Sequence, residues 1–455
     1  MTGKISRIYS SDAYKFVGNI IKLKGFVRLR RDHGKLIFLD LRDKNGLIQI
    51  VVNPKVSDKA YQEARELKPE YAIEVIGSVN KRPQGSANKD LGLSGGVEVE
   101  ANEIKILSKA EVLPFDMGSD ELKLELPTLL DFRSLTLRHP RVASIFKVQE
   151  AVAGAFREGA VKLGCTEIFV PTISASATEG GAEVFKVNYY DYEAYLTQSP
   201  QLYKQIMVGV FERVYTISHA YRAEPSVTTR HLAESVQLDV EIGFIDNFEE
   251  LLDALEFMGT FIVAEVSKKC QKTLSLFNVE KPLIPVTIPR LTLKEAQEII
   301  FKVSKGRRDP RNEQDLNSTD EKIICEWAKN EKNSDFVTIT HFPTKKRAFY
   351  SLPDPKDPKL SLSYDLLFRG MEILSGSQRV NDYHQLMQIM EERKLNPESF
   401  SMYLQAFKYG IPPEGGFSFG LERLTMKLLE LPNVREASLF PRDMERVDER
   451  LSVSK

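Results

Sequence analysis

The pattern of hydrophobic and polar positions divides the chain into two parts. Residues 1–107 contain short β-rich runs, and the sequence Asp43-Lys-Asn-Gly46 between two of them is typical of a hairpin turn. The runs begin at Val17, Leu36, Leu47, Tyr71 and Val97. A helical pattern at about 56–68 separates the third run from the fourth. Five strands with a helix in that position predict an all-β OB barrel.

The second part, residues 137–455, mixes helical and extended patterns without βαβ regularity. A long amphipathic helix is predicted from His139 to about Lys162, followed by a strand, Glu167–Pro171. Further strands are predicted at 214–221, 235–244, 336–340, 362–368 and 371–374, with helices at 248–271 and 293–302. This mixture favours an α+β domain built on an antiparallel sheet. Residues 108–136 contain Pro114 and Pro127 and are predicted to be a linker.

Composition and charge exclude few functions. The net charge is -1, so no global positive field indicates nucleic acid, although a local basic patch would suffice. Cys165, Cys270 and Cys325 have neither metal-ligand spacing nor a disulfide pattern, which favours a reducing compartment. The N-terminus lacks a secretory signal, and no segment approaches the ~20 apolar residues of a membrane span. We therefore expect a cytoplasmic protein with no membrane contact.

Arg222-Ala223-Glu224 is the most informative pair of charges. Both residues are expected to be fixed on a strand, where side chains two residues apart share one face. A guanidinium can hold a phosphate through two parallel donors, and a neighbouring carboxylate can accept from the amino group of adenine. Arg-x-Glu on a strand is more often a surface ion pair, so this pair needs support from elsewhere.

Four other segments could hold a nucleotide in a chain that has neither a P-loop nor a dinucleotide fingerprint. They are Glu179-Gly-Gly-Ala-Glu183, Gln198-Ser-Pro-Gln-Leu-Tyr-Lys-Gln205, the set Asp365, Glu372, Ser375 and Arg379, and Gly415–Arg423. Each alone fits an ordinary turn, a solvated helix or exposed strand residues. Their order and spacing together favour function.

These segments resemble a known family. Pro171, Arg222-Ala-Glu224 and Gly420-Leu-Glu-Arg423 look like motifs 1, 2 and 3 of class II aminoacyl-tRNA synthetases. An OB barrel before that domain is similar to the subclass that activates aspartate, asparagine or lysine. Residues 177–185, 198–205, 229–232, 396–400 and 440–443 resemble aspartyl-tRNA synthetases. The large insertion of many bacterial members is absent, as in the compact archaeal or eukaryotic form.

The resemblance implies an ATP site with Mg²⁺. Arg222 would hold the α-phosphate and the attacking carboxylate, Glu224 would bind the adenine amino group, and Arg423 would clamp the γ-phosphate. The implied catalytic residues are Arg222, Glu372 and Arg423, and Glu372 would also bind the metal ion. The full implied ATP set is Arg222, Ala223, Glu224, Arg230, His231, Leu232, Glu372, Gly420, Leu421, Glu422 and Arg423. Glu372, Ser375 and Asp365 are the implied magnesium ligands, oxygen donors that suit this ion. Ser235-Val236 stands where many class II enzymes place a phenylalanine under adenine, so we expect His231 to stack there instead.

The resemblance also implies a pocket for L-aspartate. Lys204 and Arg379 would supply fixed positive charge for the side-chain carboxylate, and an amide in its place would leave buried cations unpaired. Asparagine enzymes of the subclass lack the Gln-Leu-Tyr-Lys pattern that ends at Lys204, which makes this lysine the discriminating residue. The full implied set is Glu179, Ser199, Gln201, Lys204, Arg222, Asp239, Ser375 and Arg379, with Glu179 as a lid.

The barrel would bind the tRNA anticodon. An aromatic ring offers a stacking face and an amide offers hydrogen bonds to base edges, which is how single-stranded RNA is bound. The predicted contacts are Arg31, Phe38, Gln49 and Glu74. His33 and Gly85 resemble residues of enzymes with relaxed recognition of the third anticodon base, which charge both tRNA(Asp) and tRNA(Asn).

Motif 1 implies a homodimer, because its helix and strand pack across a two-fold axis in this class. Three other functions stay open: an asparaginyl-tRNA synthetase, a tRNA-independent asparagine synthetase, and a catalytically inactive RNA-binding paralogue. Phe38 and Gln49 disfavour the second of these, and the set Arg222, Glu224, Glu372, Arg379 and Arg423 disfavours the third.

Overall fold

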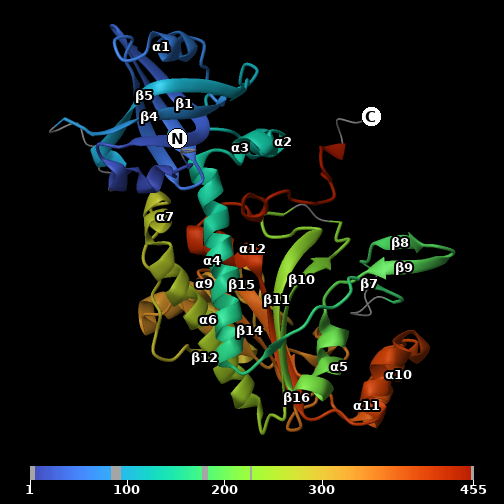
Figure 1. The fold of residues 1–455 in the computed structure, drawn as a ribbon. Helices are drawn as coiled ribbons and strands as arrows, with labels where there is room; N and C mark the ends of the chain where they lie inside the picture. Colours follow the sequence, from blue (N-terminus) through green and yellow to red (C-terminus); the bar gives the residue numbers. More distant parts are fainter. Residues whose placement is uncertain (1–5, 84–93, 177–182, 226–227, 452–455) are drawn as a thin grey trace. The chain divides into compact units, whose positions relative to one another are not determined.

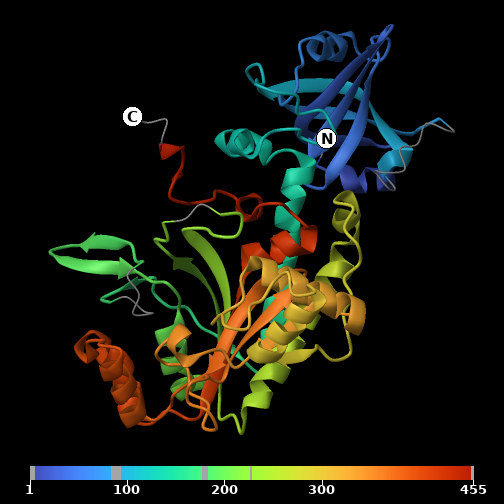
Figure 2. The same cartoon turned by 180° about the vertical axis from the view of Figure 1, so that it is seen from behind.

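The chain folds into two compact units, Met1–Glu125 and Leu126–Lys455 (Figures 1 and 2). The structure, a computed structural model, describes residues 6–83, 94–176, 183–225 and 228–451. The stretch 108–136, expected to be a linker, contains two short helices in its second half, α2 (Leu126–Asp131) and α3 (Arg133–Thr136). Pro127 fits there because proline is tolerated in the first turn of a helix.

The first unit is a closed five-stranded barrel, as predicted, with strand order β1-β2-β3-β5-β4. Its elements are β1 (Ile20–His33), β2 (Leu36–Asp43), β3 (Gly46–Val52), α1 (Asp58–Arg65), β4 (Ala72–Lys81) and β5 (Val97–Ser108). Buried and half-buried residues alternate along β4, so each strand presents one face to the core and one to the outside. Leu23, Leu39, Ile50, Val75 and Val99 are among the fully buried residues of the core.

The second unit is built on an eight-stranded sheet in the order β12-β13-β14-β15-β16-β11-β10-β6, most of it antiparallel. The strands are β6 (Thr166–Glu167), β10 (Arg213–Tyr221), β11 (Glu234–Gly243), β12 (Arg290–Thr292), β13 (Phe336–Thr340), β14 (Ser363–Phe368), β15 (Met371–Gln378) and β16 (Glu414–Gly420). A small sheet beside it contains β7 (Ile173–Ser174), β8 (Lys186–Tyr189) and β9 (Tyr192–Leu196).

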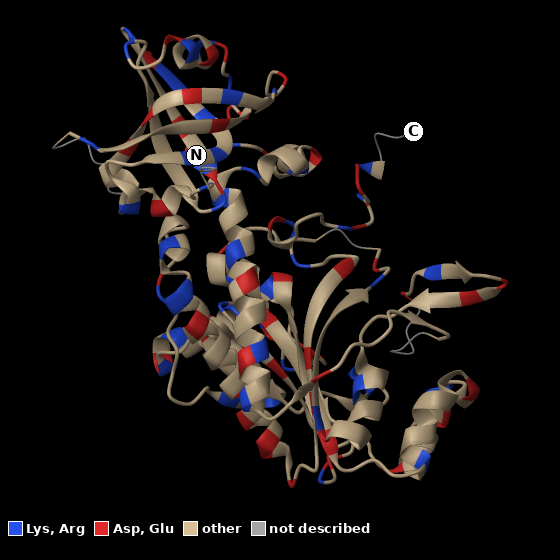
Figure 3. Ribbon diagram, in the orientation of Figure 1, with Lys and Arg blue, Asp and Glu red and all other residues tan. Residues whose placement is uncertain are grey.

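Helices cover both faces of the large sheet. They are α4 (Pro140–Lys162), α5 (Gln201–Phe211), α6 (Phe248–Lys269), α7 (Gln271–Leu276), α8 (Leu293–Val303), α9 (Ser318–Lys332), α10 (Tyr383–Glu392), α11 (Ser401–Lys408) and α12 (Leu421–Leu429). Figure 3 shows basic and acidic residues interspersed along α4 and the helices beside it. None of the helices in the described ranges is long and apolar enough to cross a membrane.

Side chains along β11 alternate between the two faces of the sheet, and the two faces carry different kinds of residue. Leu238, Val240 and Ile242 belong to the large core with α4, α6 and α12. Asp239 and Glu241 point to the opposite face, because successive side chains of a strand alternate, and they contact side chains of α5. A single strand therefore supplies both core residues and buried carboxylates.

The predicted strand at Glu167–Pro171 is shorter in the structure. β6 pairs with β10 only at Thr166 and Glu167, and one further hydrogen bond joins Ile168 N to Tyr215 O. Pro171 has no N–H to donate to a ladder, which is consistent with an early end of pairing.

Candidate active site and nucleic-acid interface

The central strands and α5 enclose a polar cleft in the second unit. One end is a cavity of about 460 Å³, within the range usual for small-molecule sites. A second cavity adjoins it, and Arg222, Glu224, Gln237, Ser375 and Ser418 line both. Most of the residues predicted to bind ATP and aspartate thus line two adjoining compartments of one cleft.

The first compartment contains most of the residues expected to bind aspartate. Ser199, Gln201, Lys204, Arg222, Asp239, Ser375 and Arg379 all line it. Glu179 lies outside the described residues. The two cations, Lys204 on α5 and Arg379 just after β15, are both buried. Sequence reasoning placed them together correctly, although they are far apart in the chain.

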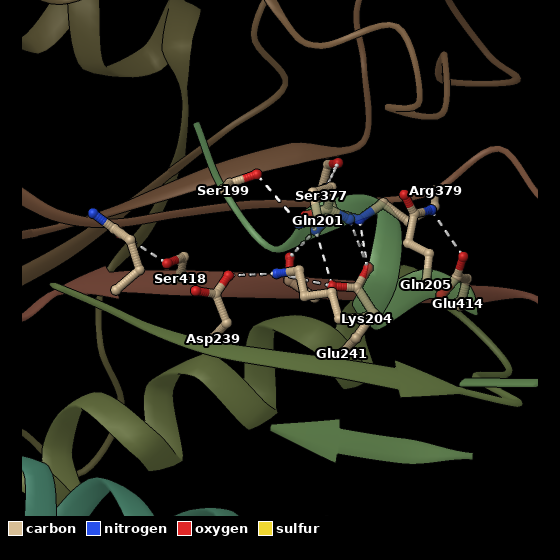
Figure 4. A network of polar contacts seen from close by, with 12 residues as sticks. Ser199, Gln201, Lys204, Gln205, Asp239, Glu241, Ser377, Arg379, Glu414 and Ser418 are labelled. Atoms are coloured by element: carbon tan, nitrogen blue, oxygen red, sulfur yellow. Dashed lines mark hydrogen bonds and ion pairs between the residues drawn. The ribbon is translucent and has the colours of Figure 1, made fainter. Parts of the chain in front are cut away.

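Glu241 connects the two cations (Figure 4). Lys204 Nζ lies 3.1 Å from Glu241 Oε2, and Arg379 Nε donates to Glu241 Oε1 at 2.6 Å. Gln201 joins the same network, because Arg379 Nη2 donates to its Oε1 at 3.1 Å. Burial alone would raise the pKa of Glu241, but Arg379 and Lys204 outweigh it and lower that pKa. Glu241 was missed from the sequence, although its position two residues after Asp239 on a predicted strand could have indicated it.

Asp239 offers an acceptor to a ligand. Its Oδ1 accepts from Lys204 Nζ at 2.8 Å, whereas its buried Oδ2 has no hydrogen-bond partner among the described residues. Burial raises the pKa of Asp239 although Lys204 opposes the shift. A buried unpaired carboxylate oxygen is costly, so an ammonium group bound beside it would be stabilised.

The second compartment contains the residues expected to bind ATP. Arg222, Glu224, Arg230, His231, Leu232, Glu372, Gly420, Glu422 and Arg423 line it. Ala223 and Leu421 do not: Ala223 N donates to Glu183 O at 3.1 Å, and Leu421 is buried in the large core. These two positions differ from expectation because neighbouring residues on the same segments point their side chains to the cleft.

Arg222 and Glu224 meet without a strand to hold them. β10 ends at Tyr221, and Arg222 N donates to Ala233 O at 2.9 Å. The two side chains nevertheless approach to 3.9 Å between Arg222 Nη1 and Glu224 Oε1, and half of the Arg222 side chain is exposed. The arginine is therefore accessible to a ligand and has a neighbouring carboxylate.

Hydrogen bonds and ion pairs orient the other charged residues of this compartment. Arg230 Nη2 donates to both carboxylate oxygens of Glu321 on α9, each at 2.9 Å. Arg423 Nη1 lies 3.5 Å from Glu372 Oε1. Burial raises the pKa of Glu422 to about 7, and both of its oxygens accept from Val236 N. The partner Glu321 has no sequence signal, because it comes from a segment far from the motifs.

His231 lies in the same compartment, where it was expected to stack. Its Nδ1 is 2.7 Å from Thr228 Oγ1. Burial, and then the charge of Arg423, lower the pKa of His231. The ring is therefore neutral at neutral pH, which suits stacking on an uncharged base.

The implied metal ligands divide into two groups. Glu372 and Ser375 line the second compartment, whereas Asp365 does not and is buried against Arg347, with 2.6 Å between Arg347 Nη2 and Asp365 Oδ2. Arg347 Nη1 also donates to Ser375 Oγ at 3.1 Å. In the described ranges, no cluster of three or more His, Cys, Asp or Glu residues has the spacing of a metal site. Sequence reasoning missed Arg347, which occupies the position next to Asp365 that a cation was expected to take.

The barrel gathers four of its predicted contact residues on one outer surface. Phe38 and Gln49 lie on β2 and β3 and are both half-buried, and Arg31 on β1 is paired with Phe38 in the register. The His33 ring contacts Phe38 edge-to-face, with 5.7 Å between centroids. Gln49 Nε2 donates to Glu98 Oε2 at 3.0 Å, and an amide side chain also has an oxygen that can accept from a base edge.

The other two predicted barrel residues are Glu74 and Gly85. Glu74 lies on β4, and its carboxylate is 3.0 Å from Lys24 Nζ and 3.8 Å from Lys22 Nζ on β1. The hydrogen bond from Lys24 lowers the pKa of Glu74. Gly85 lies outside the described residues.

Comparison with known proteins identifies the class. Residues 125–444 match the family described as tRNA synthetases class II (D, K and N), and residues 21–107 match the OB-fold nucleic acid binding domain. The chain belongs to the class II aminoacyl-tRNA synthetase family of the aspartate, lysine and asparagine enzymes.

Similar proteins within this family include aspartate–tRNA ligases. The aspartate–tRNA(Asp/Asn) ligase of Thermus thermophilus is 40% identical over 97% of this chain and 99% of its own length. The aspartate–tRNA(Asp) ligase of Pyrococcus furiosus is 38% identical over 94% and 96%. Among solved structures, asparaginyl-tRNA synthetase from Pyrococcus horikoshii with asparaginyl-adenylate has a TM-score of 0.88 at 31% identity, and the match covers 98% of this chain and 100% of that one.

We expect Arg347→Met to destabilise the second unit by about 3–5 kcal/mol, because it leaves the buried carboxylate of Asp365 without its cation. Burial already raises the pKa of Asp365 to about 6, and the loss of Arg347 would raise it further. Adding Asp365→Asn should restore most of the stability, since both charges are then removed together. Urea unfolding followed by the fluorescence of Trp327, the single tryptophan, measures both variants. Equal stability of Arg347→Met and the unchanged protein would contradict the ion pair.

Proposed function

We propose that this chain attaches L-aspartate to tRNA(Asp), and also to tRNA(Asn), through an aspartyl-adenylate made from ATP. One observation carries the choice of amino acid. Two buried cations, Lys204 and Arg379, line one cavity together with Asp239, whose buried Oδ2 has no hydrogen-bond partner among the described residues. A small molecule with a carboxylate at one end and an ammonium group beside it matches this arrangement of charges.

The chemistry needs positioning more than acid–base catalysis. The α-carboxylate of aspartate is already ionised and attacks the α-phosphorus of ATP, and pyrophosphate leaves. Both reactants are anions, so the protein must hold them together and neutralise the charge that builds up. Arg222, which lines both compartments, would contact the attacking carboxylate and the α-phosphate.

The remaining residues hold the nucleotide. Glu224 would accept from the adenine amino group, His231 would stack on the ring, and Arg423 would bind the γ-phosphate. Glu372 and Ser375 place oxygen donors in the ATP compartment, which fits Mg²⁺, and the ion would neutralise phosphate charge when bound. In the second step the terminal ribose hydroxyl of the tRNA attacks the adenylate carbonyl, and AMP leaves.

An asparaginyl-tRNA synthetase is the second candidate, because the solved structures of such enzymes are similar to this chain. An amide side chain in the first compartment would lose the charge-assisted hydrogen bonds that a carboxylate can accept from the two buried cations. The penalty for that loss is about 3 kcal/mol, or roughly 100-fold in affinity. This argument, together with the names of the most similar relatives, favours aspartate.

We expect aspartate, and not asparagine, to drive ATP–pyrophosphate exchange. Arg222→Ala should lower kcat for exchange at least about 100-fold, because a charge-stabilising donor is lost. Phe38→Ala on the barrel is the control: it should leave exchange unchanged while it lowers the rate of tRNA charging. Near-normal exchange by Arg222→Ala would exclude the assigned role, and exchange driven by asparagine would favour the second candidate.

The relaxed tRNA specificity rests on His33 and on the relatives. The His33 ring contacts the Phe38 ring at the surface proposed to bind the anticodon. Three similar proteins, from Thermus thermophilus, Aeropyrum pernix and Deinococcus radiodurans, are aspartate–tRNA(Asp/Asn) ligases.

Purified protein should charge transcripts of both tRNA(Asp) and tRNA(Asn) with aspartate, whereas a tRNA(Lys) transcript should stay uncharged. Because the two substrates share the same surface, Phe38→Ala should weaken both reactions. Charging of tRNA(Asp) alone would show that the enzyme is discriminating.

The proposed enzyme is a homodimer formed through α4 and the segment that follows β6. Phe169 in that segment is 87% exposed and Val161 on α4 is 63% exposed, although both are apolar. Both residues lie on the helix and segment of motif 1, which pack across a two-fold axis in this class.

Sedimentation at micromolar concentration should give the mass of a dimer. Phe169→Asp should shift the mass toward the monomer, because it places a charge in the interface. Tyr190→Asp is a matched control, since Tyr190 is equally exposed but lies on the β8–β9 turn. A monomeric unchanged protein would refute this proposal.

A further inference from the structure

Three buried carboxyl groups lie beside only two buried cations behind the first compartment. Asp239, Glu241 and Glu414 are at most 1% exposed. They form a row on the neighbouring strands β11 and β16, and side chains of α5 contact all three. Lys204 contacts Asp239 and Glu241, and Arg379 contacts Glu241. Among the ion pairs of the described residues, none includes Glu414. One carboxyl group therefore has no cation of its own.

The hydrogen-bond partner of Glu414 is a neutral side chain. Glu414 Oε1 accepts from Gln205 Nε2 at 2.9 Å (Figure 4). Gln205 Oε1 in turn accepts from the Tyr403 hydroxyl at 3.1 Å. The buried Oε2 of Glu414 has no hydrogen-bond partner within the described parts of the chain. An ionised carboxylate in this position would cost far more than a protonated one, because burial penalises the charged form.

The burial of Glu414 and a neighbouring negative charge also favour its neutral form. Burial, followed by the charge of Glu241, raises the pKa of Glu414 well above its usual value, although Gln205, Arg379 and Lys204 oppose the shift. Tyr403, on α11, is also titratable, but burial raises its pKa well above the usual value, so it stays protonated. Glu414 is thus a carboxyl group in this row that has no cation of its own and whose surroundings favour the neutral form.

The state of Glu414 affects the charge that a ligand meets. Arg379 N donates to Glu414 O at 2.9 Å, and Arg379 Nη2 donates to Gly416 O at 3.0 Å, so strand β16 holds the arginine at two points. With Glu414 neutral, Lys204 and Arg379 balance Asp239 and Glu241. With Glu414 ionised, three anions face two cations, and the compartment repels an incoming carboxylate.

We propose that Glu414 is a positioning residue that stays uncharged, so that Lys204 and Arg379 keep their attraction for the side-chain carboxylate of the amino acid, and that its ionisation weakens aspartate binding. This inference rests on the proposed function, since it concerns the same compartment. The residue acts through Arg379 and Glu241, and it does not touch the reacting atoms.

The binding test compares the KM for aspartate of the unchanged protein and Glu414→Gln in pyrophosphate exchange between about pH 6.5 and 9. Glutamine reproduces the neutral acid, so the two proteins should have the same KM at the acidic end. The KM of the unchanged protein should then rise faster, by up to about tenfold per pH unit above the pKa of Glu414, while kcat follows the same course in both. Deprotonation of Lys204 or of the substrate affects both proteins alike and cancels in the ratio.

Two outcomes of this test would overturn the proposal. Parallel KM profiles would show that Glu414 does not titrate against the substrate. A loss of aspartate affinity in Glu414→Gln at neutral pH would show that the pocket needs a negative charge there. Glu398→Gln, which removes an exposed carboxylate from the same unit, should follow the unchanged protein throughout.

A second measurement separates this proposal from the proposed function, because it needs no substrate. A carboxyl group whose pKa is raised by folding stabilises the fold fully below its unfolded pKa of about 4.3, and this stability is lost as pH rises through the folded pKa. The melting temperature of Glu414→Gln should therefore exceed that of the unchanged protein by a margin that grows with pH. A margin independent of pH would overturn the neutral state of Glu414. Absence of aspartate-driven exchange in the unchanged protein would instead refute the proposed function alone.

Discussion

The shared use of Glu241 by Lys204 and Arg379 is the interaction on which the amino-acid compartment depends. Two like charges cannot be buried side by side unless an anion lies between them, because each loses its hydration. The carboxylate is fixed on a central strand whose opposite face is packed in the large core. The positions of the cations are therefore determined by the sheet, and they do not need a ligand to bring them together.

The same arrangement explains how the compartment can distinguish charges. Glu241 offsets part of the positive charge of the two cations, so the compartment is not a general anion site. The remaining attraction is directional, since Arg379 is also held by Gln201 and by Gly416 O. A ligand must place its carboxylate where these donors point, and its ammonium group near Asp239.

Patterns along the chain were enough to predict the architecture and much of the site. The order of strands and the position of the helix between them predicted the barrel, whereas the residues of the cleft were predicted from the resemblance of their segments to class II synthetases. Phe38 and Gln49 were expected on adjacent strands, and in the structure both are half-buried on the paired strands β2 and β3. These features depend on local periodicity or on short segments with several unusual residues.

The residues that were missed are partners across long distances in the sequence. Arg347 takes the place next to Asp365, and Glu321 orients Arg230 from α9. Neither lies in a distinctive segment, and only the tertiary structure brings them to the cleft. Glu414 was missed for a different reason. It stands just before the pair Gly415-Gly416, which was interpreted as the functional feature of this segment. That the nearby cations pair with Asp239 and Glu241 is visible only in the tertiary structure.

Glu321 has a consequence for how the nucleotide compartment is assembled. One carboxylate accepts from the guanidinium of Arg230 and from the backbone N–H of Glu372, at 2.9 and 3.2 Å. The loop after β10 and the strand β15 are thereby joined through a helix that contributes no atom to the lining of either cavity. A tilt of that helix would displace both walls of the compartment at once, so the width of the nucleotide slot is set from outside it.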